Sequence, residues 1–264
     1  MKRAQPSSIL TIGDGNLSYS LSLISSIPGL SVTATTYDSL DELRAKYTAH
    51  KIDETISKIC AHSGSRVLHG VDARKLEASV NGSCLFDRIV FMHPLVPNWE
   101  TAEFVKANGR DFATLLINRH MLVTFLESAS GFLTQDGEIH ITIKNVHPYT
   151  VWRVGKLARW VPCLESLGKE DFDASVAALY ESRNVERDTP FPLTQSVTYI
   201  FRKRKNPIAP PPPRKDLFCD VCDSLFTSAK DQALHQASKA HKKTSNIEKA
   251  WLDYTIKLGI GSTD

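Results

Sequence analysis

The chain has 264 residues, enough for one full-size domain and a small second unit, and its hydrophobic content of 42% is that of an ordinary globular protein. Its net charge of +3 is too small to identify a nucleic-acid-binding protein, although basic residues gather in the last quarter. Apart from the pair Cys219 and Cys222, the three cysteines that remain are widely spaced and odd in number, which argues against a disulfide framework, and no apolar stretch is long enough for a signal peptide or a membrane span. We therefore expect an intracellular soluble protein without membrane contacts.

Short apolar runs alternate with amphipathic stretches over the first 205 residues. Six strands are predicted, at residues 8–13, 31–37, 66–70, 87–92, 138–144 and 196–201. Four helices are predicted between them, at residues 17–26, 40–59, 111–133 and 149–160. Strand, helix and strand in repetition predict an α/β fold with a parallel sheet covered by helices on both faces.

A glycine turn stands where the first predicted strand meets the first predicted helix. Gly13 and Gly15 let the backbone pass close to a ligand, and the helix N-terminus beyond them offers unpaired N–H groups. A sharp strand-to-helix connection alone also requires such a turn. Asp38 strengthens the nucleotide interpretation, because it follows the second strand about twenty residues on, where a carboxylate accepts ribose hydroxyls.

The charge at this edge distinguishes between two nucleotide ligands. Asp14, Asp38 and Asp72 follow three successive strands, and their carboxylates would repel the pyrophosphate of a dinucleotide but attract the cationic groups of S-adenosylmethionine. Ser18 also stands where a dinucleotide fingerprint has a third glycine. The pattern favours S-adenosylmethionine, with a nicotinamide-dependent dehydrogenase as a distant alternative.

Several motifs together resemble the eukaryotic ribosomal RNA uridine-N3 methyltransferases over about residues 7–203. They are Ile9-Leu-Thr-Ile-Gly-Asp-Gly-Asn-Leu-Ser, Ala34-Thr-Thr-Tyr-Asp-Ser, Gly70-Val-Asp-Ala, Phe86-Asp-Arg-Ile-Val-Phe, Asn118-Arg119, Gly137-Glu-Ile-His-Ile-Thr-Ile-Lys-Asn and Pro148-Tyr-x-x-Trp. The resemblance implies a Rossmann-like class I methyltransferase sheet with its last strand antiparallel. It also implies a pocket for S-adenosylmethionine lined by Gly13, Asp14, Gly15, Asn16, Ser18, Asp38 and Asp72.

The segment after the fourth strand departs from that family. The family typically has Phe-Asn-Phe-Pro-His where this chain has Phe91-Met-His-Pro-Leu. We interpret His93 as a candidate base or hydrogen-bond partner for a uracil, Pro94 as the aligned residue, and Lys144 as a group that stabilises an oxyanion or contacts phosphate. A structural histidine and a solvated lysine are the competing interpretations.

Two hypotheses follow, the first from the glycine turn and the three aspartates together with the C-terminal Cys/His motif, and the second from the altered segment. One is an RNA methyltransferase that acts on a uridine N3 of large-subunit ribosomal RNA. The other is a catalytically inactive methyltransferase-like adapter that binds RNA during ribosome assembly.

Residues 206–215 are rich in proline and predict a polyproline spacer after a first domain of residues 1–205. Beyond it, Cys219 and Cys222 are followed by His235 and His241, a spacing that can close a tetrahedral shell around one zinc ion. We expect a ββα finger at residues 216–245, with a helix at residues 229–239 and a small core, and a tail with helical character at residues 246–264. The core is assigned to Phe218, Phe226 and Leu234.

The finger resembles the matrin-type zinc finger, a family whose members often bind double-stranded or structured RNA. Lys239, Lys242 and Lys243 can reach phosphates, although packing against a protein partner or solvation of charged side chains is the alternative. The basic residues 202–205, with Arg214 and Lys215 across the linker, are compatible with a nuclear import signal, and phosphate contact or solvation is the alternative. The expected partners are structured RNA, in particular ribosomal RNA, and pre-ribosomal proteins, and the expected location is the nucleus and its nucleolus.

Overall fold

The computed structural model describes residues 5–108, 110–184, 188–205 and 217–260. Internal contacts divide the chain into two compact units, residues 1–205 and residues 206–264. The expected linker at residues 206–215 lies outside the described residues. No described helix combines the length and the apolarity needed to cross a membrane.

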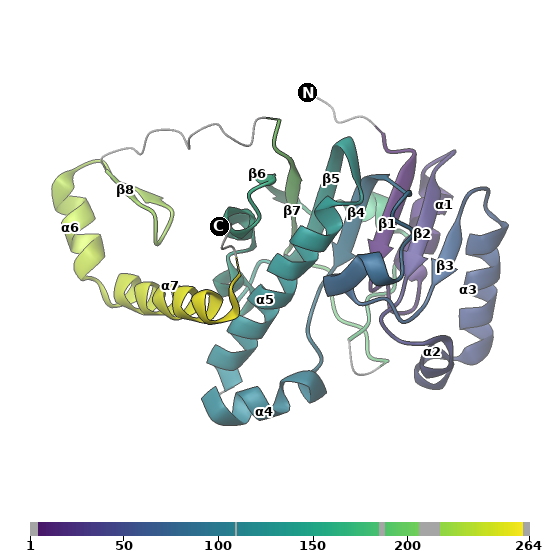
Figure 1. The fold of residues 1–264 in the computed structure, drawn as a ribbon, viewed down its shortest axis with the longest axis horizontal. Helices are drawn as coiled ribbons and strands as arrows, with labels where there is room; N and C mark the ends of the chain where they lie inside the picture. Colours follow the sequence, from purple (N-terminus) through teal and green to yellow (C-terminus); the bar gives the residue numbers. More distant parts are fainter. Residues whose placement is uncertain (1–4, 109, 185–187, 206–216, 261–264) are drawn as a thin grey trace. The chain divides into compact units, whose positions relative to one another are not determined.

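A seven-stranded sheet forms the frame of the first unit (Figure 1). Its strands are β1 (Ser8–Ile12), β2 (Ser31–Thr35), β3 (Arg66–Leu68), β4 (Phe86–Met92), β5 (Leu133–Lys144), β6 (Leu164–Asp171) and β7 (Ser196–Lys203). They lie in the order β3-β2-β1-β4-β5-β7-β6. The strands from β1 to β5 pair in parallel, whereas β7 is antiparallel to both β5 and β6. The predicted α/β fold with an antiparallel last strand is confirmed.

In the first unit, α1, α3 and α5 contact strands of the sheet, whereas α2 packs on α3 and α4 packs on α5 (Figure 1). The α-helices are α1 (Ser18–Ser26), α2 (Leu40–Lys46), α3 (Ala49–Ala61), α4 (Asn98–Asn108) and α5 (Arg110–Ser130). Four short 3-10 helices are η1 (Ala73–Ala78), η2 (Tyr149–Trp152), η3 (Val154–Trp160) and η4 (Ala174–Ala177).

Strand alternation supplies a separate apolar layer to each face of the sheet. On one face, Val90 of β4 belongs to a buried cluster with Leu23 of α1 and Ile59 of α3. The next residue, Phe91, points to the opposite face and packs edge-on against Phe125 of α5, with ring centroids 4.9 Å apart. The two layers fix the carboxyl ends of β1, β2, β4 and β5 at one edge.

Several elements differ from the sequence-based prediction. The helix expected at residues 40–59 is interrupted, because Tyr47 and Thr48 adopt extended backbone between α2 and α3. Residues 149–160 form 3-10 turns around a left-handed Arg153 in place of an α-helix. The strand β6 was not predicted.

The second unit contains a small hairpin of β8 (Phe218–Cys219) and β9 (Ser224–Leu225), followed by α6 (Ala229–Ala237) and α7 (Lys239–Leu258). Helix α7 crosses the expected boundary at residue 245, so the helical tail continues the helix that carries His241. The predicted core is wrong in one residue: Leu234 is 63% exposed. The reason is its place in α6, because it directly precedes His235 and points about 100° away from the histidine's side of the helix.

Candidate active site and metal centre

A cavity of about 380 Å³ lies at the carboxyl edge of the sheet in the first unit. Ligands of open α/β sheets bind at this edge, beyond the carboxyl ends of the strands. Six of the seven predicted cofactor residues line it, namely Gly13, Asp14, Gly15, Asn16, Asp38 and Asp72. The seventh, Ser18, forms hydrogen bonds to Asn16 and to the backbone of Glu181.

The glycine turn fits tightly at the wall of this cavity. Gly13 has a φ of +59°, and a Cβ there would meet the ring of Phe91 at 3.3 Å. A Cβ on Gly15 would lie 2.9 Å from the hydroxyl of Tyr47, the residue at which α2 ends. The left-handed backbone at Gly13 therefore requires glycine, whereas a side chain at position 15 would have to displace the Tyr47 hydroxyl, which the break between α2 and α3 places beside the turn.

The three acidic residues at this edge are each engaged by a neighbour. Asp14 is 4% exposed, and its Oδ2 accepts hydrogen bonds from the backbone N–H and the hydroxyl of Ser20, at 2.7 and 2.6 Å. Burial raises the pKa of Asp14, although the Ser20 hydrogen bonds oppose that shift. This carboxyl fastens the glycine turn to α1.

The other two carboxylates form ion pairs. Asp38 lies 3.1 Å from the ammonium of Lys46, and Asp72 binds the guanidinium of Arg74 at 2.8 Å. Burial would raise the pKa of Asp72, but the hydrogen bonds and charge of Arg74 outweigh it and lower that pKa. The cavity edge is thus less negative than three unpaired carboxylates would make it, which weakens the charge argument for the cofactor made from the sequence.

His93 occupies the end of the cavity beyond β4. Its φ of +48° is unusual for a residue other than glycine, and its Nε2 lies 3.1 Å from the hydroxyl of Ser196 on β7. Its ring stacks on Tyr180 and meets Phe191 edge-on, with centroids 6.5 and 4.9 Å away. The buried Nδ1 has no hydrogen-bond partner among the described residues.

The environment keeps this imidazole neutral. Burial, aided by the charge of Lys144, lowers the pKa of His93 from 6.5 to about 3. A base works best with a pKa near the working pH, so His93 in this position is a weak proton acceptor and serves better as a hydrogen-bond partner. Of the two roles predicted for His93, base or hydrogen-bond partner of a uracil, its environment favours the hydrogen-bond partner.

The low pKa has a consequence for stability. Because folding disfavours the protonated imidazole, the contribution of His93 is present above pH 6.5 and is lost as the pH falls toward 3. We expect His93→Gln to flatten the acid-side decline in the free energy of unfolding by up to about 1.4 kcal/mol per pH unit. Urea titrations between pH 4.5 and 7.5 measure this. The exposed His50→Gln is the control, and equal slopes in both variants would contradict the assignment.

Lys144 and Pro94 also line the cavity. The ammonium of Lys144 donates hydrogen bonds to the backbone carbonyls of Pro192 and Thr194. These carbonyls belong to the connection between β6 and β7, which the sequence analysis did not assign to the site. The connection also contributes Tyr180, Arg183 and Phe191 to the cavity wall. Its aromatic residues were the available signal, but the stretch has no periodicity that would have placed them at this edge.

Two motif residues of α5 brace the same wall. Asn118 is fully buried, accepts a hydrogen bond from the N–H of Val96 at 3.0 Å and donates one to the carbonyl of Thr114. Arg119 is 1% exposed and donates to the carbonyl of Val151 in η2 at 2.7 Å. The Asn118-Arg119 motif thus holds the loop after β4 and the turn after β5 in place.

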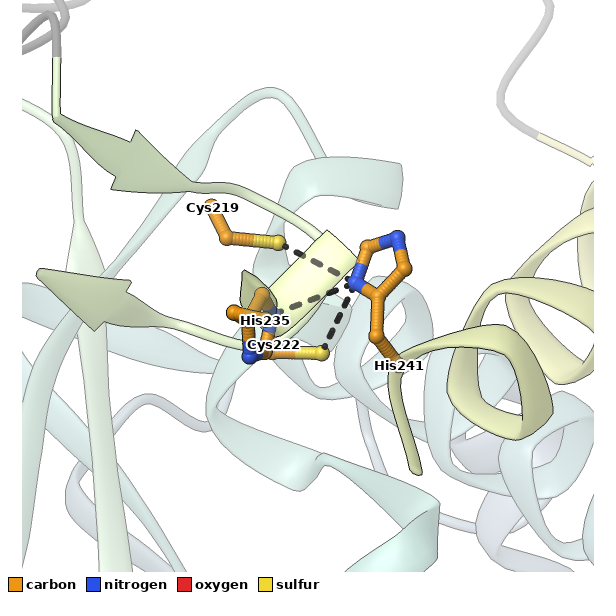
Figure 2. A group of neighbouring side chains, drawn as sticks. All are labelled: Cys219, Cys222, His235 and His241. Atoms are coloured by element: carbon orange, nitrogen blue, oxygen red, sulfur yellow. Dashed lines mark hydrogen bonds between the residues drawn. The ribbon is translucent and has the colours of Figure 1, made fainter. Parts of the chain in front are cut away.

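Four predicted metal ligands come together in the second unit (Figure 2). The donor atoms of Cys219, Cys222, His235 and His241 all lie within 4.8 Å of one another. The Nδ1 of His241 is 3.6 and 3.5 Å from the two sulfurs and 3.1 Å from the Nε2 of His235. A tetrahedral zinc ion with Zn–S of about 2.3 Å and Zn–N of about 2.0 Å would separate sulfur and nitrogen by about 3.5 Å. The donor set therefore fits zinc.

The local structure explains how the ligands meet. Cys219 is the last residue of β8, Cys222 lies in the turn of the β8–β9 hairpin, and His235 lies in the last turn of α6. Ser238 ends α6 and caps α7 through the N–H of His241, which turns the second histidine back toward the first. Phe226 packs on the His235 ring, with centroids 4.9 Å apart.

The predicted RNA-contacting lysines lie at the start of α7. Lys239, Lys242 and Lys243 are all exposed, and their spacing places them on one side of the helix. The basic residues 202–205 are different, because Arg202 pairs with Glu165 and Lys203 donates to the carbonyl of Leu133. Arg202 and Lys203 are the last two residues of β7, whereas Arg214 and Lys215, the other part of the predicted import signal, lie outside the described residues.

The strand order, the antiparallel β7 and the glycine turn at the cavity together define a class of protein, the S-adenosylmethionine-dependent methyltransferases. Within this class, a family model described as rRNA (uridine-N3-)-methyltransferase BTM5-like matches residues 10–184. The chain belongs to this BMT5-like family. The matched residues end before the Cys/His group of the second unit.

Curated proteins similar to this chain cover about three quarters of it. The uncharacterized protein At4g26485 of Arabidopsis thaliana is 33% identical over 201 residues, which make up 73% of this chain and 91% of that protein. Heavy metal-associated isoprenylated plant protein 41 of Arabidopsis thaliana is 30% identical over 203 residues, 74% of this chain but 36% of that protein. The chain thus spans nearly all of the first relative and about a third of the second.

Solved structures with a similar arrangement include two methyltransferase-fold proteins. TrmN from Thermus thermophilus has a TM-score of 0.44 and 16% identity, with 75% of this chain and 44% of that chain covered. A methyltransferase from Pyrococcus furiosus has a TM-score of 0.46 and 14% identity, with 76% of each chain covered.

Proposed function

We propose that this protein transfers a methyl group from S-adenosylmethionine to N3 of a uridine in large-subunit ribosomal RNA. The observation that carries the proposal is the family match over residues 10–184, which includes the glycine turn and most of the residues that line the cavity. The proposed partners are structured ribosomal RNA and pre-ribosomal proteins, and the proposed location is the nucleolus.

In this proposal, one end of the cavity binds the cofactor and the other end binds the acceptor base. When bound, S-adenosylmethionine supplies a methyl group carried by a cationic sulfur. Gly13 and Gly15 let the backbone approach it, and Asp38 accepts hydrogen bonds from its ribose. His93 and Phe191 orient the acceptor ring at the other end, because correct alignment contributes much of the acceleration in such a transfer. The N3 proton leaves to water, since the imidazole of His93 binds a proton weakly.

Methylation of RNA by the full chain tests this function. The protein would be incubated with labelled S-adenosylmethionine and ribosomal RNA, and the digested nucleosides would be separated. We expect labelled N3-methyluridine, and we expect its loss in Gly13→Ala, in which the new Cβ is strained at a φ of +59° and meets Phe91. Saturable binding of the cofactor without any labelled nucleoside would favour the second hypothesis, an inactive adapter. The altered Phe91-Met-His-Pro-Leu segment motivates that hypothesis.

We further propose that the finger binds one zinc ion through Cys219, Cys222, His235 and His241 and contacts RNA phosphates through α7. Replacing Lys242 and Lys243 together by glutamate should weaken RNA binding and reduce the slope of log K against log salt by about 1.5, because two phosphate contacts are lost. Filter binding at salt concentrations from about 50 to about 300 mM measures the slope. Lys257→Glu, exposed near the other end of α7, is the matched control. An unchanged slope would mean that RNA phosphates do not contact Lys242 and Lys243.

A further inference from the structure

The connection between β6 and β7 is described at residues 172–184, here called the first arm, and at residues 188–195, the second arm. Both arms contribute residues to the cavity wall. The first arm is anchored at the cofactor end. The N–H of Glu181 donates to the hydroxyl of Ser18 at 2.9 Å, and the side-chain amide of Asn16 donates to the carbonyl of Glu181 at 3.0 Å. The N–H of Leu179 donates to the hydroxyl of Ser22 on α1 at 3.1 Å.

The two arms are joined to each other. Arg183 and Pro190 form an isolated antiparallel bridge, and the N–H of Asn184 donates to the carbonyl of Thr189 at 3.0 Å. The hydroxyl of Ser182 donates to the carbonyl of Phe191. Because of these bonds, a displacement of one arm moves the other.

The second arm is anchored at the acceptor end, and Lys144 makes most of that attachment. Its ammonium donates to the carbonyls of Pro192 and Thr194, the latter at 2.6 Å, and lies 5.9 Å from the centroid of the Phe191 ring. Among the described residues, the end of β5 also holds this arm through the N–H of Asn145, which donates to the carbonyl of Gln195 at 2.7 Å. Hydrogen bonds from a charged donor are stronger than those from a neutral one.

The two arms carry two aromatic rings to the cavity, and the ring of Tyr180 also packs edge-on against Tyr19 of α1. Tyr180 of the first arm and Phe191 of the second arm both contact the ring of His93. These three rings line the cavity beyond β4, where the proposed reaction places the acceptor base. A flat nucleobase can bind against such rings by stacking.

We infer that Lys144 is a positioning residue, which holds residues 179–184 and 188–195 over the cavity so that Tyr180 and Phe191 form a wall of the acceptor site. Lys144 then acts through this segment and not by contacting the reacting atoms. The assignment of an acceptor site rests on the proposed function, whereas the attachment itself does not.

Hydrogen exchange of the full chain, read by mass spectrometry without RNA or cofactor, tests the attachment. In Lys144→Met, we expect the amides of Glu181 and Asn184 to exchange at least about tenfold faster, because a charged hydrogen-bonding group is removed. The amide of Asp14, bonded to the carbonyl of Thr35 in the sheet, should keep its rate. Lys144→Arg should restore part of the protection.

Lys203→Met is the matched control. The ammonium of Lys203, on β7, also donates to a backbone carbonyl, that of Leu133, but Lys203 does not line the cavity. This variant should leave exchange in both arms unchanged. Unchanged exchange in Lys144→Met would overturn the inference.

Kinetics provide the second readout. A positioning role predicts that Lys144→Met raises KM for RNA several-fold more than it lowers kcat. A fall in kcat with normal exchange would make Lys144 a catalytic residue and would also overturn the inference. If the wild-type chain methylates no RNA, the proposed function fails, while the exchange rates still decide whether Lys144 holds the segment.

Discussion

Removing zinc from the full chain is expected to unfold the hairpin and α6 of the second unit while the first unit keeps its structure. The reason is the shortage of apolar burial: among the described hydrophobic residues of the second unit, Cys219 and Trp251 are buried, whereas Leu225 and Leu234 are more than half exposed. A unit of this size folds alone with difficulty, and metal binding contributes about 10–16 kcal/mol to the folding of zinc-finger peptides.

Chelation followed by limited proteolysis measures this loss. We expect new cleavage within residues 217–237 and an unchanged thermal transition of the first unit. Cys222→Ser should behave like the chelated protein, since it leaves three ligands. Cys163→Ser, an exposed cysteine of the first unit, is the control. Loss of structure in both units, or protection that survives chelation, would contradict the expected independence and the expected metal.

The parts of the fold that were predictable from the sequence are those in which burial imposes a pattern. Strands β1, β2 and β4 are short and almost wholly buried, and their apolar runs made them recognisable. The edge strand β6 was missed because six of its eight residues are exposed, and because Gly168, at a φ of +103°, interrupts its register. An exposed edge strand carries no apolar alternation to detect.

The helix break at Tyr47 was hidden for a related reason. Residues 40–59 contain no glycine or proline to mark a break, and the low helix propensity of Tyr47 and Thr48 is too weak a signal to show where α2 ends. The extended backbone at Tyr47 brings its side chain to Gly15, a contact that no local pattern encodes. Local sequence thus predicted the elements, while the contacts between distant residues determined their ends.

The candidate site follows the same rule. Gly13, Gly15, Asp38 and the four Cys/His residues are recognisable because backbone geometry and metal coordination restrict residue type and spacing. The partners of the charged groups were not predictable, because Lys144 meets residues about fifty positions away in a segment without periodicity. The sequence therefore indicated candidate site residues but not the partners that surround them.

Replacing Asp38 by alanine is expected to weaken binding of S-adenosylmethionine by about 10- to 100-fold, because a charged acceptor of ribose hydrogen bonds is lost. Calorimetric titration of the full chain measures the affinity. Asp53→Ala provides a matched control. Asp53 of α3 also forms an ion pair with a basic residue of α2, Arg44, at 2.8 Å, but it does not line the cavity.

A second variant separates direct contact from the ion pair with Lys46. Lys46→Met breaks the same pair and leaves the Asp38 carboxylate in place. If Asp38 binds the ribose, Lys46→Met should lose much less affinity than Asp38→Ala, because the acceptor remains and loses a competing cation. Equal losses in the two variants would mean that the ion pair supports the cavity wall and that the ribose is bound by other residues. Normal affinity in Asp38→Ala would remove the ribose contact altogether and leave the glycine turn as the chief evidence for the position of the cofactor.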